Sequence, residues 1–388
     1  MRLRILLFFM VCQLPVFAQV QLSPHAEISI ITCGPDQDEL YSAFGHSAIR
    51  VQDLANGLDL AYNYGVFKFS PTFYLNFMRG ELLYKLGVSR FDDFQAFYIS
   101  QNRYVHEQLL NLSAQQKQLI FDYLENNAKP KNATYRYDYF YNNCATKVRD
   151  VFVDLFANHI KFDESYTTPG YTIRMLTGDR LRKQPWGKLA IDICLGLPMD
   201  KKLTLFEYMY LPDYLESGFD HATIDGQPLV KGKIPIYVEQ KTSPSLNLFQ
   251  PWLIFAVVLY LTALISKSDL KRNSRSKWFD LTLFPVTGAI GIVLLLLWFA
   301  TDHKAAADNL NLLWAFPLHI FVPVFLGNKK FHTLLKPYFL GTLILLTILF
   351  PLWVVMSKPL NNDLTATPLI LYIRTLTLYR LNKKTLFV

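Results

Sequence analysis

Cys144 is the residue in this sequence with the clearest capacity for covalent chemistry. It follows two asparagines in YNNCATKVR (141–149), and Asn142 or Asn143 is a good N-cap, so the thiol is expected in the first turn of a helix. Unpaired backbone N–H groups and the positive end of the helix dipole favour a thiolate at such a position. The same N–H groups can hold an oxyanion, so one location supplies both a nucleophile and transition-state stabilisation.

His46 is the best candidate for the proton shuttle that a thiol nucleophile needs. It opens the stretch 46–51 after Gly45, a small residue that leaves room for a second group. If the stretch is extended, a period of two places His46 on the face opposite Ile49 and Val51. The other histidines lie in polar surroundings, in loops, inside an apolar segment or far along the helix of the thiol. They are His25, His106, His159, His221, His303, His319 and His332.

Asn63 is the candidate for a third catalytic residue. It lies in the strand-like segment 61–66, on the face opposite Tyr64, where its side chain could fix the tautomer of His46 as the third member of a triad does. The alternative is a buried cysteine with a structural histidine, and the spacing leaves both open. A zinc site is a poor match because His46 and Cys144 stand roughly a hundred residues apart with no second pair at short spacing. The sequence predicts no metal and no cofactor.

An α+β domain is the expected fold of the region that carries these residues. The runs 27–33, 47–51 and 61–66 are rich in β-branched and aromatic side chains and are typical of strands. The segment 113–127 has a capping serine and an apolar stripe at helical spacing, and the same spacing continues from residue 144 onward.

A membrane domain is predicted for residues 249–388, where long apolar stretches replace the mixed composition of the earlier chain. The expected spans are 249–265, 279–300, 312–326, 338–356 and 366–379. The fifth is short and is interrupted by Arg374.

Charge and targeting agree on the orientation of the chain. Residues 1–18 have two arginines, an apolar run and small residues at positions 16 and 18, as a cleaved secretory signal peptide does. The basic segments of the membrane region are 267–277, 328–336 and 380–384. With five spans these segments all fall on the cytoplasmic side, so the domain 19–248 lies outside the membrane.

The formal net charge of +8 is explained by this retention charge, so no nucleic-acid partner is predicted, and nothing indicates an oligomeric state. After removal of the signal peptide three cysteines are left, Cys33, Cys144 and Cys194. An odd number in a compartment that permits disulfides leaves at least one thiol free or paired with another chain. A bridge between Cys33 and Cys194 stays open, since spacing alone cannot establish it.

The stretch VFKFSPTFYLNFMRGELLYKL (66–86) combines many aromatic side chains with basic ones. Such a stretch could line an acyl groove or enter the headgroup region, and a plain aromatic core hairpin is an equal alternative. The candidate substrate-binding residues are Asn143, Arg79, Tyr64 and His303. His303 belongs to the outer loop after the second span, and Arg79 is a possible phosphate or carboxylate partner.

The order of these motifs resembles that of the circularly permuted papain-like hydrolases and the lecithin:retinol acyltransferase-like enzymes. More specifically, the segments 32–53, 62–67, 135–150 and 203–215 are similar to the periplasmic domain of the Lnb family of bacterial lipoprotein N-acylation transferases. This resemblance implies a permuted papain-like domain followed by an all-α membrane domain. His46 and Cys144 match the family's motif positions, and Asn63 is assigned by analogy.

The same resemblance implies a function. Cys144 would take an acyl group from a glycerolipid ester as a thioester and pass it to the α-amine of a lipoprotein's lipidated N-terminal cysteine. The donor would be the lipoprotein's own sn-2 chain, which leaves a lyso-form product. Lipoproteins, glycerolipids and the membrane are then the expected partners. Two rival hypotheses are an envelope cysteine peptidase or amidase acting on peptidoglycan peptides, and a non-catalytic receptor or chaperone.

Overall fold

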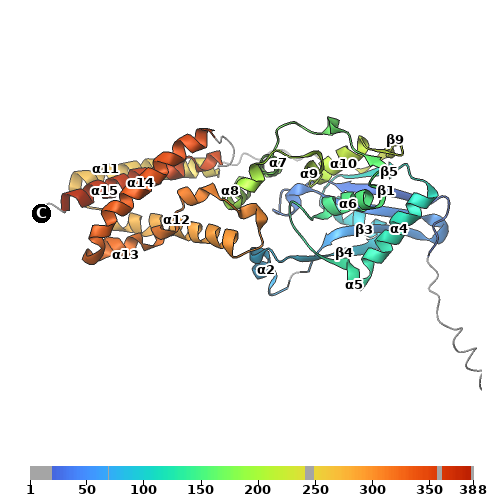
Figure 1. Cartoon of the computed structure of the whole chain (residues 1–388), viewed down its shortest axis with the longest axis horizontal. Coiled ribbons are helices and arrows are strands. Elements are labelled where there is room, and N and C mark those ends of the chain that lie inside the picture. Colours follow the sequence, from blue (N-terminus) through green and yellow to red (C-terminus); the bar gives the residue numbers. More distant parts are fainter. Residues whose placement is uncertain (1–19, 69, 241–248, 356–360, 386–388) are drawn as a thin grey trace, which may run out of the picture.

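A computed structural model describes residues 20–68, 70–240, 249–355 and 361–385. The expected signal peptide, residues 1–18, lies outside the described residues. The chain forms a sheet-rich domain followed by an elongated bundle of helices (Figure 1). The α+β fold expected for the first region and the helical membrane domain expected for the second are both confirmed.

The centre of the first domain is a seven-stranded sheet with the order β10-β5-β1-β2-β3-β4-β6, in which every neighbouring pair is antiparallel. Its strands are β1 (Glu27–Cys33), β2 (His46–Asp53), β3 (Leu58–Val66), β4 (Leu83–Arg90), β5 (Val105–Leu110), β6 (Thr134–Arg136) and β10 (Val230–Tyr237). A smaller sheet is built from β7 (Ile160–Lys161), β8 (Thr223–Ile224) and β9 (Gln227–Pro228). The three strand-like runs of the sequence are therefore strands β1, β2 and β3.

Helices cover both faces of the large sheet. The two longest, α4 (Ala114–Ala128) and α6 (Cys144–Phe156), pack on the face to which Ile49 and Val51 point. Helix α3 (Phe91–Ser100) packs on the other face, which carries the small side chain of Ala48. Burial of each large apolar side chain in these layers stabilises the fold by about 1.5–3 kcal/mol.

Six shorter helices complete the domain. They are α2 (Phe73–Arg79), α5 (Pro130–Ala133), α7 (Ile173–Arg180), α8 (Pro185–Cys194), α9 (Leu205–Tyr208) and α10 (Pro212–Asp220). Figure 1 shows that α2 and α8 lie at the end of the domain that faces the bundle.

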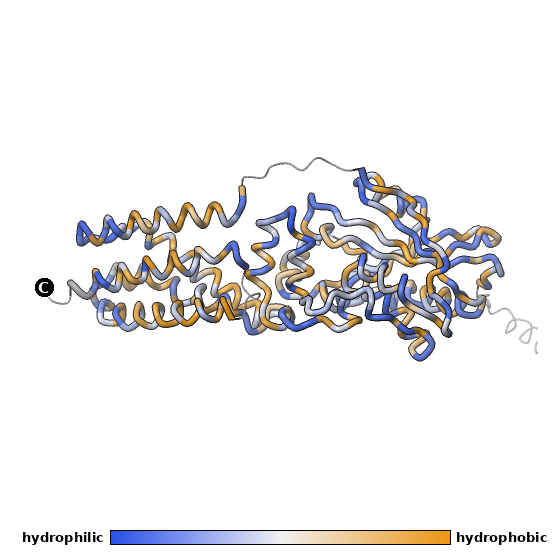
Figure 2. Tube along the Cα trace, turned by 90° about the horizontal axis from the view of Figure 1, so that it is seen from above, coloured by the Kyte–Doolittle hydropathy of each residue, from blue (hydrophilic) through white to orange (hydrophobic). Residues whose placement is uncertain are grey.

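The bundle consists of α11 (Pro251–Arg272), α12 (Lys277–Phe299), α13 (Val322–Gly327), α14 (His332–Val355) and α15 (Ala366–Thr385). Among the described residues, 4 stretches are long and apolar enough to cross a membrane: Pro251–Arg272, Lys277–Phe299, Leu310–Gly327 and His332–Val355. Their hydrophobic residues dominate one end of the molecule (Figure 2). The third stretch is broken into 3-10 turns before α13, which the continuous apolar run of the sequence did not indicate.

Helix α15 corresponds to the expected fifth span, although it is not one of the 4 apolar stretches. It packs against α11 and α14. Arg374 donates hydrogen bonds to Asp269 (Nη1 to Oδ2, 2.8 Å) and Asp280 (Nε to Oδ1, 2.5 Å), and all three side chains are fully buried. Because an unpaired charge in an apolar interior is very costly, these aspartates explain how an arginine is tolerated within the bundle.

The first domain is held against the outer end of the bundle at two places. At α2, the Asp302 N–H donates to the Arg79 carbonyl oxygen at 2.9 Å, and Arg136 forms an ion pair with Asp302. Beyond α8, the Gly196 N–H donates to the Ala305 carbonyl oxygen at 2.7 Å. The backbones are so close here that a Cβ at Gly196 would lie 1.6 Å from another carbonyl oxygen, so only glycine fits.

Candidate active site

Helix α6 begins at Cys144 because Asn143 and Thr146 form a capping box at its N-terminus. The Asn143 Oδ1 accepts from the Thr146 N–H at 2.9 Å, and the Thr146 Oγ1 accepts from the Asn143 N–H at 2.8 Å. The Asn143 Nδ2 donates to the carbonyl oxygens of Tyr139 and Tyr210, at 2.9 and 2.8 Å. Asn143 is thus the predicted N-cap. The sequence analysis named Asn143 as a candidate substrate-binding residue. In the structure its amide is buried and bonded within the protein, so it positions Cys144 instead.

The Cys144 thiol lies in a nearly closed environment, with 7% of the residue exposed. Burial raises the pKa of this thiol, but the charge of the His46 imidazole and a hydrogen bond from it act in the opposite direction. The backbone N–H groups of Ser47 and Ala145 also donate to the sulfur. Together these groups hold the pKa of Cys144 below its ordinary value of 9.0, so the site favours the thiolate.

His46 is the first residue of β2, and its ring is fixed by the neighbouring strand. The Nε2 atom lies 2.6 Å from the Asn63 Oδ1 on β3. Since a carboxamide oxygen can only accept, Nε2 carries a proton, and Nδ1 is left to exchange a proton with the thiol: it accepts from the thiol, and in the imidazolium it donates to the thiolate. The structure brings together the three residues that the sequence proposed as a catalytic set.

Gly65 lies between the nucleophile and the base. Its φ is +94°, a conformation that favours glycine, and the pairing of β3 with β4 shifts register between Asn63 and Val66. A Cβ on Gly65 would lie 3.7 Å from the Cys144 Cβ and 3.8 Å from the His46 Cε1. The irregular end of β3 therefore leaves open the space over which thiol and imidazole meet.

An aromatic residue from the opposite layer packs on the base. The rings of His46 and Tyr98, on α3, are nearly parallel, with centroids 5.7 Å apart and an interplanar angle of 16°. The Arg103 guanidinium lies 4.7 Å from the Tyr98 ring centroid, and its Nε donates to the Gly34 carbonyl oxygen at 2.6 Å. The sequence analysis did not identify Tyr98, because its contact with His46 depends on how α3 packs on the sheet.

The other candidate substrate residues do not gather at the thiol. Tyr64 is 4% exposed and packs edge-to-face on Tyr135 with ring centroids 6.0 Å apart, in the core between the sheet and α6. Tyr64 was expected to bind substrate, but its side chain is part of the core. Successive side chains of β3 point to opposite faces of the sheet, so Tyr64 points away from the face that carries Asn63. Arg79 has an exposed side chain at the end of α2. His303 lies 2.8 Å from the Phe77 carbonyl oxygen through its Nε2, so it joins the bundle to α2.

The three cysteines of the described residues are all free thiols, so the bridge between Cys33 and Cys194 that the sequence left open is not formed. Cys33 pairs with His46 across β1 and β2, close to the site. Complete burial raises the pKa of the Cys33 thiol far above its ordinary value, although the Arg103 charge acts against this. Among these cysteines only Cys144 has a lowered pKa, and Cys33 is a packing residue.

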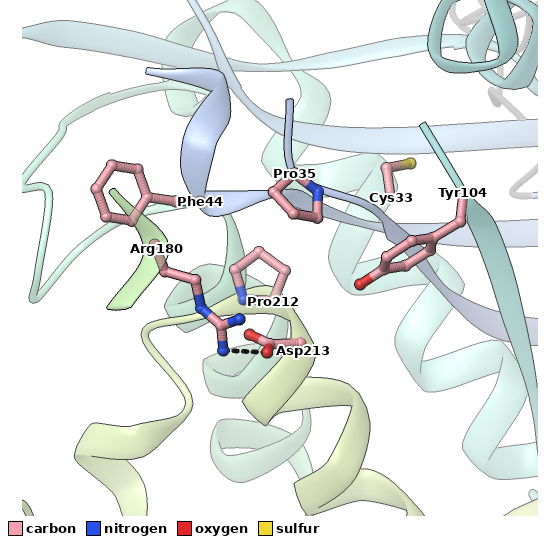
Figure 3. Close-up of a pocket in the computed structure, with 8 residues that line it drawn as sticks. Cys33, Pro35, Phe44, Tyr104, Arg180, Pro212 and Asp213 are labelled. Carbon is pink, nitrogen blue, oxygen red and sulfur yellow. Dashed lines mark hydrogen bonds and ion pairs between the residues drawn. The ribbon is translucent and has the colours of Figure 1, made fainter. Parts of the chain in front are cut away.

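A small hollow lies between Cys33, Phe44, Tyr104 and Pro212 (Figure 3). Its volume of ≈ 10 Å³ is that of one water molecule. Arg180 and Asp213 form an ion pair at its rim, and burial raises the pKa of Asp213 although the arginine opposes this. The hollow is thus a packing feature beside the site. Within the described ranges no group of three or more His, Cys, Asp or Glu residues is placed to hold a metal ion.

The fold and the site together define a multi-pass membrane protein whose sheet-rich outer domain brings a cysteine, a histidine and an asparagine together. Residues 19–178 match the family model for the Lnb N-terminal periplasmic domain, and residues 241–385 match that for the Lnb transmembrane domain. No curated protein and no solved structure matches the chain. The chain belongs to the Lnb family, so the resemblance seen in its motifs is confirmed. It is a membrane enzyme of lipoprotein modification with a periplasmic N-terminal domain.

Proposed function

We propose that this protein is a cysteine-dependent acyltransferase that N-acylates the lipidated N-terminal cysteine of bacterial lipoproteins. The single observation that carries the proposal is the geometry at the start of α6, where the Cys144 thiol meets an imidazole whose Nε2 lies 2.6 Å from the Asn63 Oδ1. The lowered pKa of Cys144 agrees with it. The proposal places the enzyme in the inner membrane, after removal of residues 1–18 as a signal peptide, with five membrane spans.

In the first half-reaction the Cys144 thiolate attacks the carbonyl carbon of a glyceryl ester. The Cys144 N–H at the start of α6 stabilises the oxyanion, because the cap at Asn143 already engages the Thr146 N–H. When the tetrahedral intermediate collapses, the glyceryl C–O bond breaks, and the imidazolium of His46 gives its proton to the departing alkoxide. The products are a lyso-glyceryl group and an acyl thioester on Cys144.

In the second half-reaction the α-amine of the lipoprotein attacks the thioester carbonyl. His46 accepts the proton that the amine loses, the C–S bond breaks, and Cys144 is regenerated as the thiolate. A thioester forms from an ester at little cost and is readily attacked by an amine, which makes it a suitable intermediate. If the donor is the sn-2 chain of the same lipoprotein, the product is an N-acylated lyso-form lipoprotein.

The test is the mass of the N-terminal lipopeptide of a lipoprotein after reaction with the purified full-length enzyme. Cys144→Ser is expected to abolish N-acylation, and Cys194→Ser, which changes the free thiol on α8, is the matched control and is expected to retain it. An acyl group that hydroxylamine releases from Cys144 would identify the thioester. A Cys144→Ser enzyme that still N-acylates at the wild-type rate would refute the proposal.

A further inference from the structure

A row of stacked aromatic rings leads away from the thiol. Tyr137 is at its inner end, because a Cβ on Gly65 would lie 3.8 Å from the Tyr137 ring and 3.7 Å from the Cys144 Cβ. Tyr137 stacks on Tyr84 with ring centroids 4.2 Å apart, and Tyr84 stacks on Phe67 at 4.9 Å. The row ends at Phe73, the first residue of α2, whose ring centroid lies 5.4 Å from that of Phe67. We name these four rings the aromatic row.

The outer end of the aromatic row lies at the level of the membrane. Asp302 comes three residues after the end of α12, a membrane-spanning helix, and its N–H donates to the Arg79 carbonyl oxygen at 2.9 Å. His303, the next residue, contacts the Phe77 carbonyl oxygen at 2.8 Å. Figure 1 shows α2 directly beside the outer end of α12. Helix α2 is therefore at the outer surface of the bilayer.

Exposed apolar side chains surround this end. Leu75, Phe77 and Met78 on α2 are 43%, 50% and 56% exposed, and Leu83 at the start of β4 is 70% exposed. A hollow of ≈ 150 Å³ lies beside them, between α2 and the start of β4. Its lining is mixed: Phe73, Leu82, Leu83 and Tyr84 on the apolar side, and Lys68, Ser70, Asn76 and Glu81 on the polar side. Large apolar side chains at the level of the headgroups are expected to enter the outer leaflet.

We propose that the aromatic row and the exposed apolar side chains around Leu83 form the binding surface for the acyl chain that is transferred, and that the chain enters from the outer leaflet beside α2. The occupant is the ester-linked chain of a lipoprotein's diacylglyceryl group. This inference rests on the proposed function and adds the route by which its substrate reaches a thiol that is only 7% exposed. Flat rings offer apolar contact along a flexible chain without requiring one conformation.

The lipoprotein is the occupant that the closed thiol favours. A thioester at Cys144 must be reached by an amine, and in a lipoprotein that amine is joined to the molecule that has just delivered the chain. The effective concentration of a tethered amine is high, so no second lipid has to enter the site. A phospholipid donor would have to leave before the lipoprotein could bind.

The first experiment compares acyl chain lengths in vesicles that contain the full-length enzyme. The substrates are two synthetic lipopeptides that differ only in carrying palmitoyl or hexanoyl esters. Leu83→Glu places a charge among the exposed apolar side chains at the outer end of the row, and Val88→Glu places the same charge at another exposed position of β4. Leu83→Glu is expected to lower kcat/KM about tenfold for the palmitoyl substrate and less than about twofold for the hexanoyl one, while Val88→Glu changes neither.

An equal effect of Leu83→Glu on both chain lengths, or no effect on either, would overturn the inference. Failure of the wild-type enzyme to N-acylate either lipopeptide would instead refute the proposed function, so the two failures are distinguishable. A lipopeptide with an ether in place of the sn-2 ester, in vesicles of labelled phospholipid, tests the occupant. Transfer of label to this lipopeptide would show that the occupant is a phospholipid and would overturn our assignment.

A second measurement needs no variant. A lipopeptide with a photoreactive diazirine in its acyl chain is irradiated with the wild-type enzyme, and the labelled residues are mapped by mass spectrometry. Labels on Phe67, Phe73, Leu83 or Tyr84 support the inference. Labels confined to other segments contradict it.

Discussion

Replacement of Asn63 by alanine tests how the base is held. In the native site the Asn63 Oδ1 lies 2.6 Å from the His46 Nε2. When His46 takes the proton of the thiol this hydrogen bond becomes charge-assisted, and such bonds contribute about 1.5–3 kcal/mol. At about 1.4 kcal/mol for a factor of ten, Asn63→Ala should lower kcat/KM by roughly 10- to 150-fold.

The loss should not equal that of Cys144→Ser, because a second contact also orients the imidazole. The Tyr98 ring stacks on His46 at 5.7 Å, and aromatic pairs of this kind contribute about 0.5–1.5 kcal/mol beyond their buried area. Some imidazole therefore stays in the productive orientation after Asn63 is removed. Asn56→Ala, at a surface amide that contacts Asp53, is the matched control and should leave kcat/KM unchanged.

The pH dependence of kcat/KM in Asn63→Ala should change in one direction. The pKa of Cys144 is lowered chiefly by His46, against the effect of burial, so the thiolate persists at lower pH than an ordinary thiol allows. Asn63→Ala removes the hydrogen bond that stabilises the imidazolium form of His46. Since that charge lowers the pKa of Cys144, the pKa of the thiol should rise. The acidic limb of kcat/KM should therefore move to higher pH. The rate of alkylation by iodoacetamide in a Cys194→Ser background measures this shift directly. Wild-type kinetics and an unmoved acidic limb in Asn63→Ala would refute the assigned role.

Three further predictions follow from the contacts described above. His46→Ala removes the main influence that lowers the pKa of the thiol, so alkylation at neutral pH should slow about tenfold or more, and no slowing would contradict the pairing. Gly196→Ala should lower the free energy of unfolding by about 1–3 kcal/mol, because the new Cβ would lie 1.6 Å from a carbonyl oxygen. Gly232→Ala, where nothing lies within 4 Å of the new Cβ, should leave the free energy of unfolding unchanged. Arg374→Met should cost about 3–5 kcal/mol in detergent, because it leaves Asp280 with only the longer ion pair to Arg275 at 3.8 Å. Asp280→Asn in the same chain should recover part of this loss. A tolerated single replacement at Arg374 would contradict the buried ion pairs.

Local sequence signals predicted the parts of the site that depend on one element each. Two polar residues before an apolar helical stripe predicted the cap at Asn143, and alternation along β2 and β3 predicted the facing sides of His46 and Asn63. These patterns depend on the backbone period alone, which tertiary structure rarely changes. The helix start, both strands and the α+β fold could therefore be predicted before the structure was known.

Contacts between elements could not be predicted in this way. The stacking of Tyr98 on His46 requires α3 to pack on the sheet at one angle, and no local pattern specifies that angle. The two aspartates that pair with Arg374 are separated from it by 105 and 94 positions in the sequence. The sequence therefore showed Arg374 only as a charge that interrupts the fifth expected span. Asn143 was also proposed as a substrate residue, and only the structure gives the carbonyl groups that occupy its amide.

The two attachments of the periplasmic domain, at Asp302 and at Gly196, have a consequence for selectivity. Because they join different helices of that domain to the bundle, we expect them to fix its orientation relative to the membrane helices. The thiol is thereby kept at a constant height above the bilayer. An ester that sits too deep in the leaflet, or too far out in the periplasm, would not meet it. Membrane thickness would then influence turnover, and vesicles of graded acyl length would reveal an optimum.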